Sequence, residues 1–557
     1  MNQPPTSATS LPSPLWTTNK SDVRMTGTWR SAVPDYRTAP SPCHGACPVN
    51  GEIATWIQQI KNNDYHGAWL TLVENNPFPA IAGRICHHPC EGSCNRLQLD
   101  ETVGICNLER FIGDMALKEN WQYPAPNKAN GKKVAIIGSG PAGLSAAYQL
   151  ARKGYQVALY ESRDQLGGLM RYGIPSYRLE KNILDGEIQR IINLGVEFHF
   201  NSKINNGDDL QKLSLQYDAL FLATGASRSK ALPSLDYSKS WVVDSADFLA
   251  STNLGETDNL GKHLLVIGGG SAAIDVARSA RRLGKTVTML SLEPEELLPA
   301  QRVEVEEAQE EGIEFVTAAM MQSVDESSNS EGLTINCVRI DFKQGQKRGE
   351  FSIDPIAESE FTLTVDGIIP SIGQDVDLSL WNNLLEGDAG LITTSAQWQT
   401  NVPGIFAGGD VATMDRFVSE AIGIGKQASY AMESYIQQTN METDALETEP
   451  EVEFSIINSY YYPLKKQHKA TNTEVSVRLK SFNEVQNPLS TEAAIAESDR
   501  CFSCGSCVYC DSCFYHCPDM AIIKLEKGYQ VKKDYCKGCG LCVAECPTGS
   551  ITMREEF

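Results

Sequence analysis

Sixteen of the seventeen cysteines in this 557-residue sequence fall in two groups near the ends of the chain, and they give its clearest chemical signal. "CVYCDSCFYHCP" and "CKGCGLCVAECP" share the x2-x2-x3 spacing, closed by proline, with which a chain wraps 4Fe-4S clusters. In such paired motifs the fourth cysteine crosses to the other cluster, because each segment passes both. Structural zinc is the weaker alternative, since the doubled spacing fits it poorly. The expected ligand sets are Cys507, Cys510, Cys513 and Cys546 for one cluster, and Cys536, Cys539, Cys542 and Cys517 for the other.

A glycine-rich turn near residue 140 could hold a pyrophosphate. In "KKVAIIGSGPAGLSAAYQLARKGYQVALYE" an apolar strand leads through Gly138, Gly140 and Gly143 into a helix and then a second strand ending at Glu161. The first glycine makes the tight turn, the second lets the backbone approach the phosphates, and the third permits close packing of helix and strand. Glu161 can accept a ribose hydroxyl. The complete unit predicts a dinucleotide site.

A second unit, "KHLLVIGGGSAAIDVARSARRLGKTVTML", repeats the design with Gly268, Gly270 and Ala273. Two units imply two dinucleotides, one resident and one exchanging, which suggests flavin plus nicotinamide. Nicotinamide gives up electrons as a hydride while clusters accept them singly, so a flavin is chemically required between them. Hydride would pass at flavin N5 without a catalytic side chain. Asp410 lies at a predicted strand-to-helix turn, where N–H groups could stabilise negative charge on reduced flavin.

These features resemble the two-dinucleotide-domain flavoproteins, and more narrowly the glutamate synthase small subunit and its relatives, including the N-terminal half of dihydropyrimidine dehydrogenase. The resemblance spans residues 41 to about 434 and includes "NPFPAIAGRIC", "CEGSCNR", "GGLMRYGIPSYRL", "ATGA", "IPSIGQ" and "GIFAGGD". It implies that the first unit binds FAD, that the second binds NAD(H) or NADP(H), and that Asp410 holds the flavin ribityl chain. The expected cofactor contacts are Gly138, Gly140, Pro141, Ala142, Gly143, Glu161, Gly168, Leu169, Thr224, Gly225, Gly268, Gly270, Ser271, Ala272, Ala273, Glu293, Gly373, Gly409, Asp410 and Ala421.

The choice between the two nicotinamide nucleotides depends on one departure from this family. Where its NADP-using members carry an Arg-Arg pair for the 2′-phosphate, this chain has Leu292 and Glu293. A carboxylate suits a free ribose diol and repels a phosphate, which favours NAD. Arg281 and Arg282 on the preceding helix leave NADP possible, although a solvated helix face is the favoured interpretation of both.

The N-terminal cysteines also depart from the family pattern. Relatives hold two 4Fe-4S clusters there and begin with a Cys-x-x-Cys pair that this chain lacks, whereas Cys501 and Cys504 are surplus at the other end. One hypothesis is that this pair completes a cluster with Cys43 and Cys94. The alternative is that both are packing residues and that the N-terminal domain holds one cluster. The six N-terminal candidates are Cys43, Cys47, Cys86, Cys90, Cys94 and Cys106; on the first hypothesis Cys47, Cys86 and Cys90 form a second cluster with Cys106 or Glu109 as fourth ligand, while His87 and His88 lie on the surface or behind the ligands and Cys337 is a buried apolar residue.

The elements that must position these residues form a multidomain protein. Apolar residues recur at three and four in "GEIATWIQQIKNNDYHGAWLTLVEN", which predicts helices, and strand-turn-helix units alternate from residue 132 to about 434. The fold class is therefore an α-helical N-terminal iron–sulfur domain, two α/β Rossmann-like dinucleotide-binding domains and a small α+β ferredoxin-like C-terminal domain. The expected division is a flexible arm (1–40), the helical domain (41–130), the FAD-binding domain in two halves (131–235 and 371–437), the NAD(P)-binding domain (236–370), a linker (438–497) and the ferredoxin-type domain (498–557).

The composition of the chain limits the kinds of partner that it can bind. The net charge of −22 disfavours nucleic acid and anionic lipid, and no apolar run is long enough to span a bilayer. The first residues lack a readable secretory signal, so a cytoplasmic location is expected. The sequence predicts an NAD(P)H oxidoreductase, within a hetero-oligomer, that moves electrons through FAD and iron–sulfur clusters to or from ferredoxin or a partner oxidoreductase. The alternative is an electron-transfer or assembly subunit without independent turnover in a larger complex of the 2-oxoacid:acceptor oxidoreductase, sulfite-reductase or glutamate synthase type.

Overall fold

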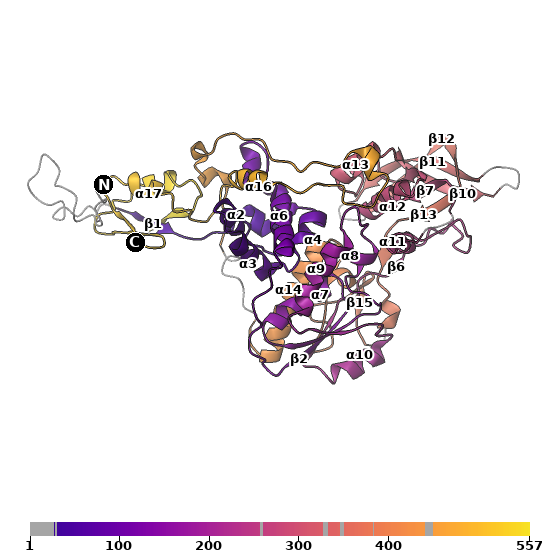
Figure 1. Ribbon diagram of the computed structural model, residues 1–557, viewed down its shortest axis with the longest axis horizontal. Helices are drawn as coiled ribbons and strands as arrows, with labels where there is room; N and C mark the ends of the chain where they lie inside the picture. The colour runs from indigo at the N-terminus through magenta and orange to yellow at the C-terminus, as the bar shows by residue number, and fades with distance from the viewer. Residues whose placement is uncertain are drawn as a thin grey trace, which may run out of the picture.

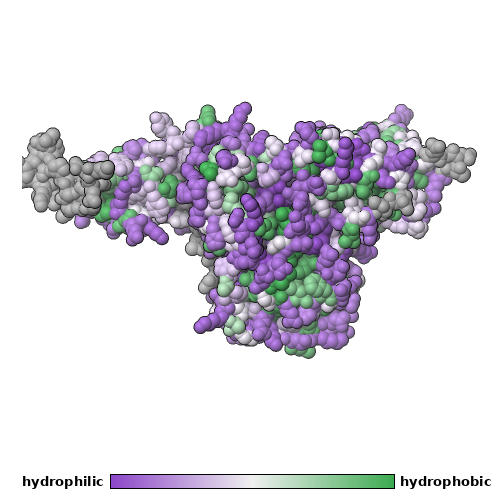
Figure 2. Space-filling view, viewed as in Figure 1, coloured by the Kyte–Doolittle hydropathy of each residue, from purple (hydrophilic) through white to green (hydrophobic). Residues whose placement is uncertain are grey.

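The computed structural model describes residues 27, 30–256, 260–326, 332–345, 350–381, 384–440 and 449–556. The molecule has the outline of a T, with a long bar and one stem (Figure 1). The helical N-terminal domain lies at the centre of the bar, the C-terminal module forms one end, and the domain built on β7 (His263–Ile267) forms the other. Hydrophilic residues cover most of the visible face, and hydrophobic residues gather on the stem (Figure 2). Within the described ranges no helix is long and apolar enough to cross a membrane.

The central domain is built from short helices whose apolar residues face one core. In α2 (Ile53–Lys61) the spacing of Ile53, Trp56, Ile57 and Ile60 places all four on the buried side. The core continues through Trp69 and into the stem without a break. The other helices of this domain are α1 (Pro42–Ala46), α3 (Tyr65–Asn75), α4 (Pro79–Ile85), α5 (Pro89–Gly92) and α6 (Ile105–Lys118), with the 3₁₀ turn η4 (Asn95–Gln98).

The stem contains a five-stranded parallel sheet in the order β17-β5-β2-β3-β4. Its central strands β2 and β5 are apolar apart from Lys133 at the start of β2, because α7 (Pro141–Arg152) and α14 (Val418–Gln437) belong to the same buried core. The strands are β2 (Lys133–Ile137), β3 (Gln156–Tyr160), β4 (Glu197–His199), β5 (Ala219–Leu222) and β17 (Ile405–Ala407), and the remaining helices are α8 (Leu169–Tyr172), α9 (Lys181–Ile192) and α10 (Gly207–Ser214). Since β17 comes from far along the chain, the sheet is assembled from two separated segments.

The intervening segment forms its own parallel sheet in the order β13-β7-β8-β9, joined to a three-stranded antiparallel sheet β10-β11-β12. Cys337 in β11 is fully buried among apolar side chains, as expected. The strands of the parallel sheet are β7, β8 (Thr286–Leu290), β9 (Glu314–Val316) and β13 (Gly367–Pro370); those of the antiparallel sheet are β10 (Ala319–Asp325), β11 (Leu333–Gln344) and β12 (Phe351–Val365); the helices are α11 (Ser245–Asn253), α12 (Ser271–Arg282) and α13 (Arg302–Glu310).

The C-terminal module contains a strand that the sequence did not predict. β1 (Ala32–Tyr36) pairs antiparallel with β20 (Ile551–Glu555), Val33 packs with Ala521 and Cys536, and the Tyr36 ring stacks on Tyr529 at 5.7 Å. The expectation of a flexible arm is therefore wrong for this stretch, because the partner of a lone strand lies at the far end of the sequence; residues 1–26, 28 and 29 lie outside the described residues. The module also contains α17 (Ser512–Tyr515), β18 (Ile522–Lys524), β19 (Tyr529–Val531) and α18 (Leu541–Ala544).

The expected linker is likewise a docked segment over its described part. The acidic run at 441–448 lies outside the described residues, but from residue 449 the chain crosses the helical domain to the domain of β7 and returns (Figure 1). Glu484 pairs with Arg84 and, at 2.7 Å, with Arg110. The Val485 N–H donates to the Tyr177 carbonyl at 3.0 Å. Polar contacts of this kind leave no apolar periodicity, so the sequence pattern resembled a linker; the segment includes η9 (Phe454–Ile456), η10 (Ser459–Tyr461), α15 (Val475–Arg478) and α16 (Thr491–Ser498).

Candidate dinucleotide and iron–sulfur sites

The first glycine turn connects β2 to α7 and leaves one position open to a ligand. Gly138 has φ +103°, and a Cβ there would lie 2.4 Å from the Ala223 carbonyl oxygen. A Cβ on Gly143 would lie 2.0 Å from the Gly138 carbonyl oxygen, so both positions require glycine. A Cβ on Gly140, by contrast, would have no protein atom within 4 Å. The N-terminal N–H groups of α7 therefore have space in front of them for a phosphate.

Glu161 lies beside this turn at the end of β3. Its carboxylate accepts hydrogen bonds from the Ser139 N–H at 3.0 Å and the Ser139 hydroxyl at 2.5 Å. The Ser162 hydroxyl and the Arg163 N–H donate to the other oxygen at 3.0 and 2.9 Å. The carboxylate is therefore fixed at the edge of the turn, where a ribose hydroxyl would share its oxygens with the two serine hydroxyls.

Three other segments meet the same turn. A Cβ on Gly168 would lie 2.8 Å from the Gly140 Cα, and a Cβ on Gly409 would lie 3.0 Å from the Ala142 Cβ. Thr224, after β5, borders Gly138. Asp410 lies in the 3₁₀ turn η7 (Gly409–Val411), ahead of α14, and burial raises the pKa of its carboxyl. These segments surround the first glycine turn, where the contacts of the first dinucleotide are expected. The remaining expected contacts lie on neighbouring elements: Pro141 and Ala142 on α7, Ala421 on α14, Leu169 at the start of α8 and Gly225 after β5.

The second glycine turn connects β7 to α12 in the same way. A Cβ on Gly268 would lie 2.2 Å from the Ser371 carbonyl oxygen, whereas one on Gly270 would meet nothing within 4 Å. The Glu293 Oε2 atom lies 3.0 Å from the Cβ position of Gly269, so the carboxylate sits over the turn. Burial raises the pKa of this carboxyl. Ser271, Ala272 and the fully buried Ala273 form the first turn of α12, and Gly373 follows β13.

The two arginines on α12 are not a solvated face, so that expectation is wrong. The side chain of Arg282 is fully buried, donates to the Glu311 carboxylate at 2.7 and 2.9 Å, and lies 3.9 Å from the centroid of the Tyr177 ring. Arg281 donates to the backbone carbonyls of Glu311 and Lys285 at 3.0 and 2.7 Å. The docked segment and α13 cover this side of α12, since Arg478 pairs with Glu311 and Arg278 pairs with Glu307. Neither guanidinium is available to a 2′-phosphate.

The C-terminal cysteines form two neighbourhoods in the crossed arrangement that the spacing predicts. Burial raises the pKa of the Cys513 thiol to about 11, and repulsion from Cys507, Cys510 and Cys546 contributes. Burial likewise raises the pKa of Cys542 to about 12, with repulsion from Cys517, Cys536 and Cys539. The second set also lines one cavity together with Pro34 and Ala521. The sulfurs of the second set therefore surround a common space, and those of the first set act on one another electrostatically.

The N-terminal cysteines divide into two groups. Burial raises the pKa of Cys86 to about 12, and repulsion from Glu109 and Cys47 adds to this; Cys47 and Cys86 in turn act on the buried Cys90. The second group, Cys43 and Cys94, lines one cavity with Cys501 and Cys504. Within the described ranges no three His, Cys, Asp or Glu side chains converge closely enough to hold a single metal ion.

Cys106 and Glu109, the two candidates for a fourth ligand of the first group, differ in their surroundings. The Cys106 thiol donates to the Gly83 carbonyl at 3.1 Å. Glu109 is buried, its carboxylate accepts from Asn76 at 2.8 Å, and burial raises its pKa to about 8. Glu109 acts electrostatically on both Cys47 and Cys86, and Cys86 acts on Cys106. Both candidates therefore lie near the cysteine group, and the Cys106 thiol is the one hydrogen-bonded to a backbone carbonyl.

Helix α14 joins the first dinucleotide site to the N-terminal cysteines, a role that sequence reasoning missed. A Cβ on Gly425 would lie 2.2 Å from the Ala142 carbonyl oxygen, and one on Gly423 would lie 2.1 Å from the Pro48 carbonyl oxygen. At the start of the helix Ser419 contacts the His87 ring nitrogen at 3.3 Å, and Phe417 stacks on that ring at 3.9 Å. Two glycines inside one helix were the available signal, because they cost stability unless another backbone approaches closely.

Three segments of the chain match models of known protein families. Residues 132–434 match the family model "Pyridine nucleotide-disulphide oxidoreductase", residues 36–121 match domain II of dihydropyrimidine dehydrogenase, a 4Fe-4S domain, and residues 529–552 match a 4Fe-4S binding domain. The NADP(+)-dependent formate dehydrogenase subunit beta of Moorella thermoacetica is 33% identical over 500 residues, covering 83% of this chain and 70% of that protein. The NADPH-Fe(3+) oxidoreductase subunit beta of Geobacter sulfurreducens is 31% identical (83% and 75%), and the NAD-dependent dihydropyrimidine dehydrogenase subunit PreT of Salmonella typhimurium is 32% identical (72% and 92%).

Proposed function

The chain belongs to the pyridine nucleotide-disulphide oxidoreductase family, and on that premise we propose that it passes electrons from NADH through its flavin domain and its N-terminal cysteines to a partner bound at the C-terminal module. It is an iron–sulfur flavoprotein that uses FAD, NAD(P)H and 4Fe-4S clusters. The observation that carries the proposal is the position of α14, whose glycines contact both the FAD turn and the loop after Cys47. Close contact of this kind favours transfer between the two groups without an intermediate partner.

FAD, when bound, supplies the conversion between hydride transfer and single-electron transfer. The N–H groups at the start of α7 would bind its pyrophosphate in the space in front of Gly140. Glu161 would accept a ribose hydroxyl, and Asp410 would contact the ribityl chain from η7. The protein contributes orientation and exclusion of water, because hydride transfer needs no side-chain acid or base.

The N-terminal group beside α14 would hold one cluster through Cys47, Cys86 and Cys90. We favour Glu109 over Cys106 as the fourth ligand. Its carboxylate interacts electrostatically with two of these thiols, whereas the Cys106 thiol is hydrogen-bonded to a backbone carbonyl. Ser419 and His87 would pack behind Cys86 and connect this group to the flavin side of the molecule.

NADH is the favoured nucleotide because of the charge around the second glycine turn. Glu293 lies over this turn, and a carboxylate suits a ribose diol but repels a 2′-phosphate. Arg281 and Arg282 on α12 are committed to Glu311 and to backbone carbonyls. The relatives include both NAD- and NADP-dependent proteins, so the choice of nucleotide rests on these residues.

A partner oxidoreductase would bind at the C-terminal module, which forms one end of the bar (Figure 1). Its two cysteine groups are the farthest from the FAD turn along the series of sites. The relatives are themselves described as subunits, which supports a hetero-oligomer. The acidic surface implied by a net charge of −22 would favour a partner with a basic face. A cytoplasmic location remains our expectation.

Anaerobic reduction of the FAD-loaded chain tests the proposal. We expect NADH to bleach the flavin and then to give reduced-cluster EPR signals, with faster bleaching by NADH than by NADPH at equal low concentration. Bleaching without cluster signals would refute the electron path. Failure to bind FAD or to react with either nucleotide would favour the assembly-subunit alternative.

A further inference from the structure

Two pairs of cysteines from opposite ends of the sequence line one cavity. Cys43 and Cys94 come from the helical domain, and Cys501 and Cys504 come from the segment that leads into the C-terminal module. Ile53, Ile57 and Phe502 also line the cavity, so its surroundings are largely apolar. Nothing in the ferredoxin-type motif requires the second pair, which lies outside the spacing of both C-terminal clusters.

The four sulfurs line the same small cavity and so form a single group. Cys43 and Cys504 are buried, and Cys94 and Cys501 are partly buried. The Asn95 amide lies 3.5 Å from the Cys504 sulfur. Four cysteine sulfurs around one apolar cavity match the ligand number of a 4Fe-4S cluster, whose cationic core would compensate the charge of four thiolates.

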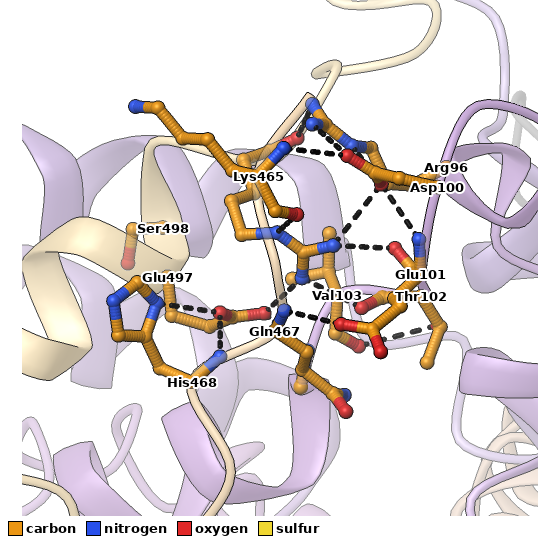
Figure 3. Close-up of polar contacts among 12 residues, drawn as sticks. Arg96, Asp100, Glu101, Thr102, Val103, Lys465, Gln467, His468, Glu497 and Ser498 are labelled. Carbon is orange, nitrogen blue, oxygen red and sulfur yellow. Dashed lines mark hydrogen bonds and ion pairs between the residues drawn. The ribbon is translucent and has the colours of Figure 1, made fainter. Parts of the chain in front are cut away.

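A buried polar network fixes the second pair against the first (Figure 3). Arg96, two residues after Cys94, donates to the Arg500 carbonyl at 3.0 Å. Arg500, directly before Cys501, donates to the carbonyls of Glu101 and Thr102 at 2.6 and 2.7 Å. Glu497 accepts from Arg500 at 2.6 Å and from the Gly104 N–H at 2.8 Å. The backbones that carry Cys94 and Cys501 are therefore held together by contacts that do not involve the cysteines.

The cavity also adjoins the sites on either side. Cys43 lies in α1, and Cys47, which belongs to the group beside α14, follows directly after that helix. On the other side, Tyr462 donates to the carbonyls of Phe502 and Pro547 at 3.1 Å each. Phe502 lines the cavity, and Pro547 follows Cys546 of the first ferredoxin-type group. The cavity thus lies between the N-terminal group and the first ferredoxin-type group.

We propose that Cys43, Cys94, Cys501 and Cys504 hold one 4Fe-4S cluster that ties the two ends of the chain together. This deepens the proposed function, on which its electron-transfer role rests, because it would place a redox group between the ligands beside the flavin domain and those of the C-terminal module. The ligand set itself does not depend on that role. The missing N-terminal Cys-x-x-Cys pair is thereby replaced by a pair from the far end of the sequence.

Iron content and EPR spectra of two double variants test the ligand set. Cys43→Ser/Cys94→Ser and Cys501→Ser/Cys504→Ser should each lose about four iron atoms per chain, one cluster's worth. Both should lose the same EPR signal after reduction with dithionite, although the substitutions lie at opposite ends of the sequence. The quadruple variant should lose no more iron than either double variant, because all four residues serve one site. Cys337→Ser, the same chemical change at a buried cysteine far from these sites, should leave iron and spectra unchanged.

Losses that add in the quadruple variant, or unchanged iron in the Cys501→Ser/Cys504→Ser variant, would overturn the shared site. If the double variants fail to fold, the single variant Cys504→Ser takes their place, and retained FAD content shows that it is folded. A shifted EPR signal for one cluster then supports the proposal, and an unchanged spectrum overturns it. Because dithionite needs neither flavin nor nicotinamide, these results stand apart from the test of the proposed function, which can fail without affecting them.

Discussion

Replacing Arg500 by methionine should loosen the contact between the C-terminal segment and the helical domain by a predictable amount. The Arg500 side chain is fully buried and pairs with Glu497, whose side chain is also fully buried, and with Asp100 at 3.1 Å. Removing one partner of a buried ion pair costs about 3–5 kcal/mol, because the other charge stays behind without compensation. Glu497 would keep only the N–H groups of Gly104 and His468 and the His468 ring as neighbours.

Native-state hydrogen exchange on the iron-loaded chain measures this cost locally. A loss of about 3–5 kcal/mol corresponds to an increase of at least about 100-fold in local opening, since 1.36 kcal/mol is a factor of ten. Peptides covering residues 499–506 should therefore exchange at least that much faster in Arg500→Met. Arg302→Met is the matched control, because Arg302 is exposed and its pair with Glu306 at 3.1 Å contributes less than about 1 kcal/mol.

The double variant Arg500→Met/Glu497→Leu separates the charge effect from lost packing. Removing both partners also removes the uncompensated carboxylate, so part of the protection should return relative to Arg500→Met alone. An increase of less than about tenfold in Arg500→Met, or a double variant whose cost equals the sum of the two single costs, would refute the reasoning.

Five further substitutions test the sites. Glu293→Arg should shift the ratio of flavin-reduction rates toward NADPH by about tenfold or more, because a guanidinium can bind a 2′-phosphate bidentately; an unchanged ratio in stopped-flow measurements would contradict our assignment of Glu293. Glu109→Ala should change the EPR signal of one cluster and Cys106→Ser should not, and the reverse pattern would make Cys106 the ligand. Gly140→Val should fold but lose FAD, since a Cβ there meets only open space, whereas Gly143→Val should fail to fold because its Cβ would lie 2.0 Å from a carbonyl oxygen; FAD absorbance and circular dichroism distinguish the two, and normal FAD binding by Gly140→Val would contradict the placement of the pyrophosphate.

Sequence reasoning succeeded where the determinants are local. The glycine turns at Gly138 and Gly268 predict a strand, a turn and a helix within about thirty residues, and the structure meets their steric requirements. It failed where a segment is held by residues far along the chain. β1 and the docked segment of Glu484 carry no periodicity of their own, because their partners belong to other domains. Arg282 was misjudged for the same reason, since the segment that covers it lies almost two hundred residues later.

The role of the surplus cysteine pair could be predicted from the sequence only in part. Counting thiols suggested that Cys501 and Cys504 belong with Cys43 and Cys94, but counting alone gave no account of how the ends could meet. The structure supplies that account through Arg96 and the polar network that surrounds it. The fourth ligand of the other N-terminal group could not be chosen from sequence, because Cys106 and Glu109 lie on the same helix, one turn apart.

The joining of the two ends of the chain has a consequence for biosynthesis. Arg96 and Arg500, which are hydrogen-bonded in the folded protein, are separated by 404 residues. At about 5–20 residues per second, the ribosome needs roughly 20–80 s to make that distance. During this time the helical domain lacks the surface that covers its cavity, and β1 lacks β20 altogether. The cavity can be completed only after Cys501 and Cys504 have been synthesised, so a domain that is made early is among the last to mature.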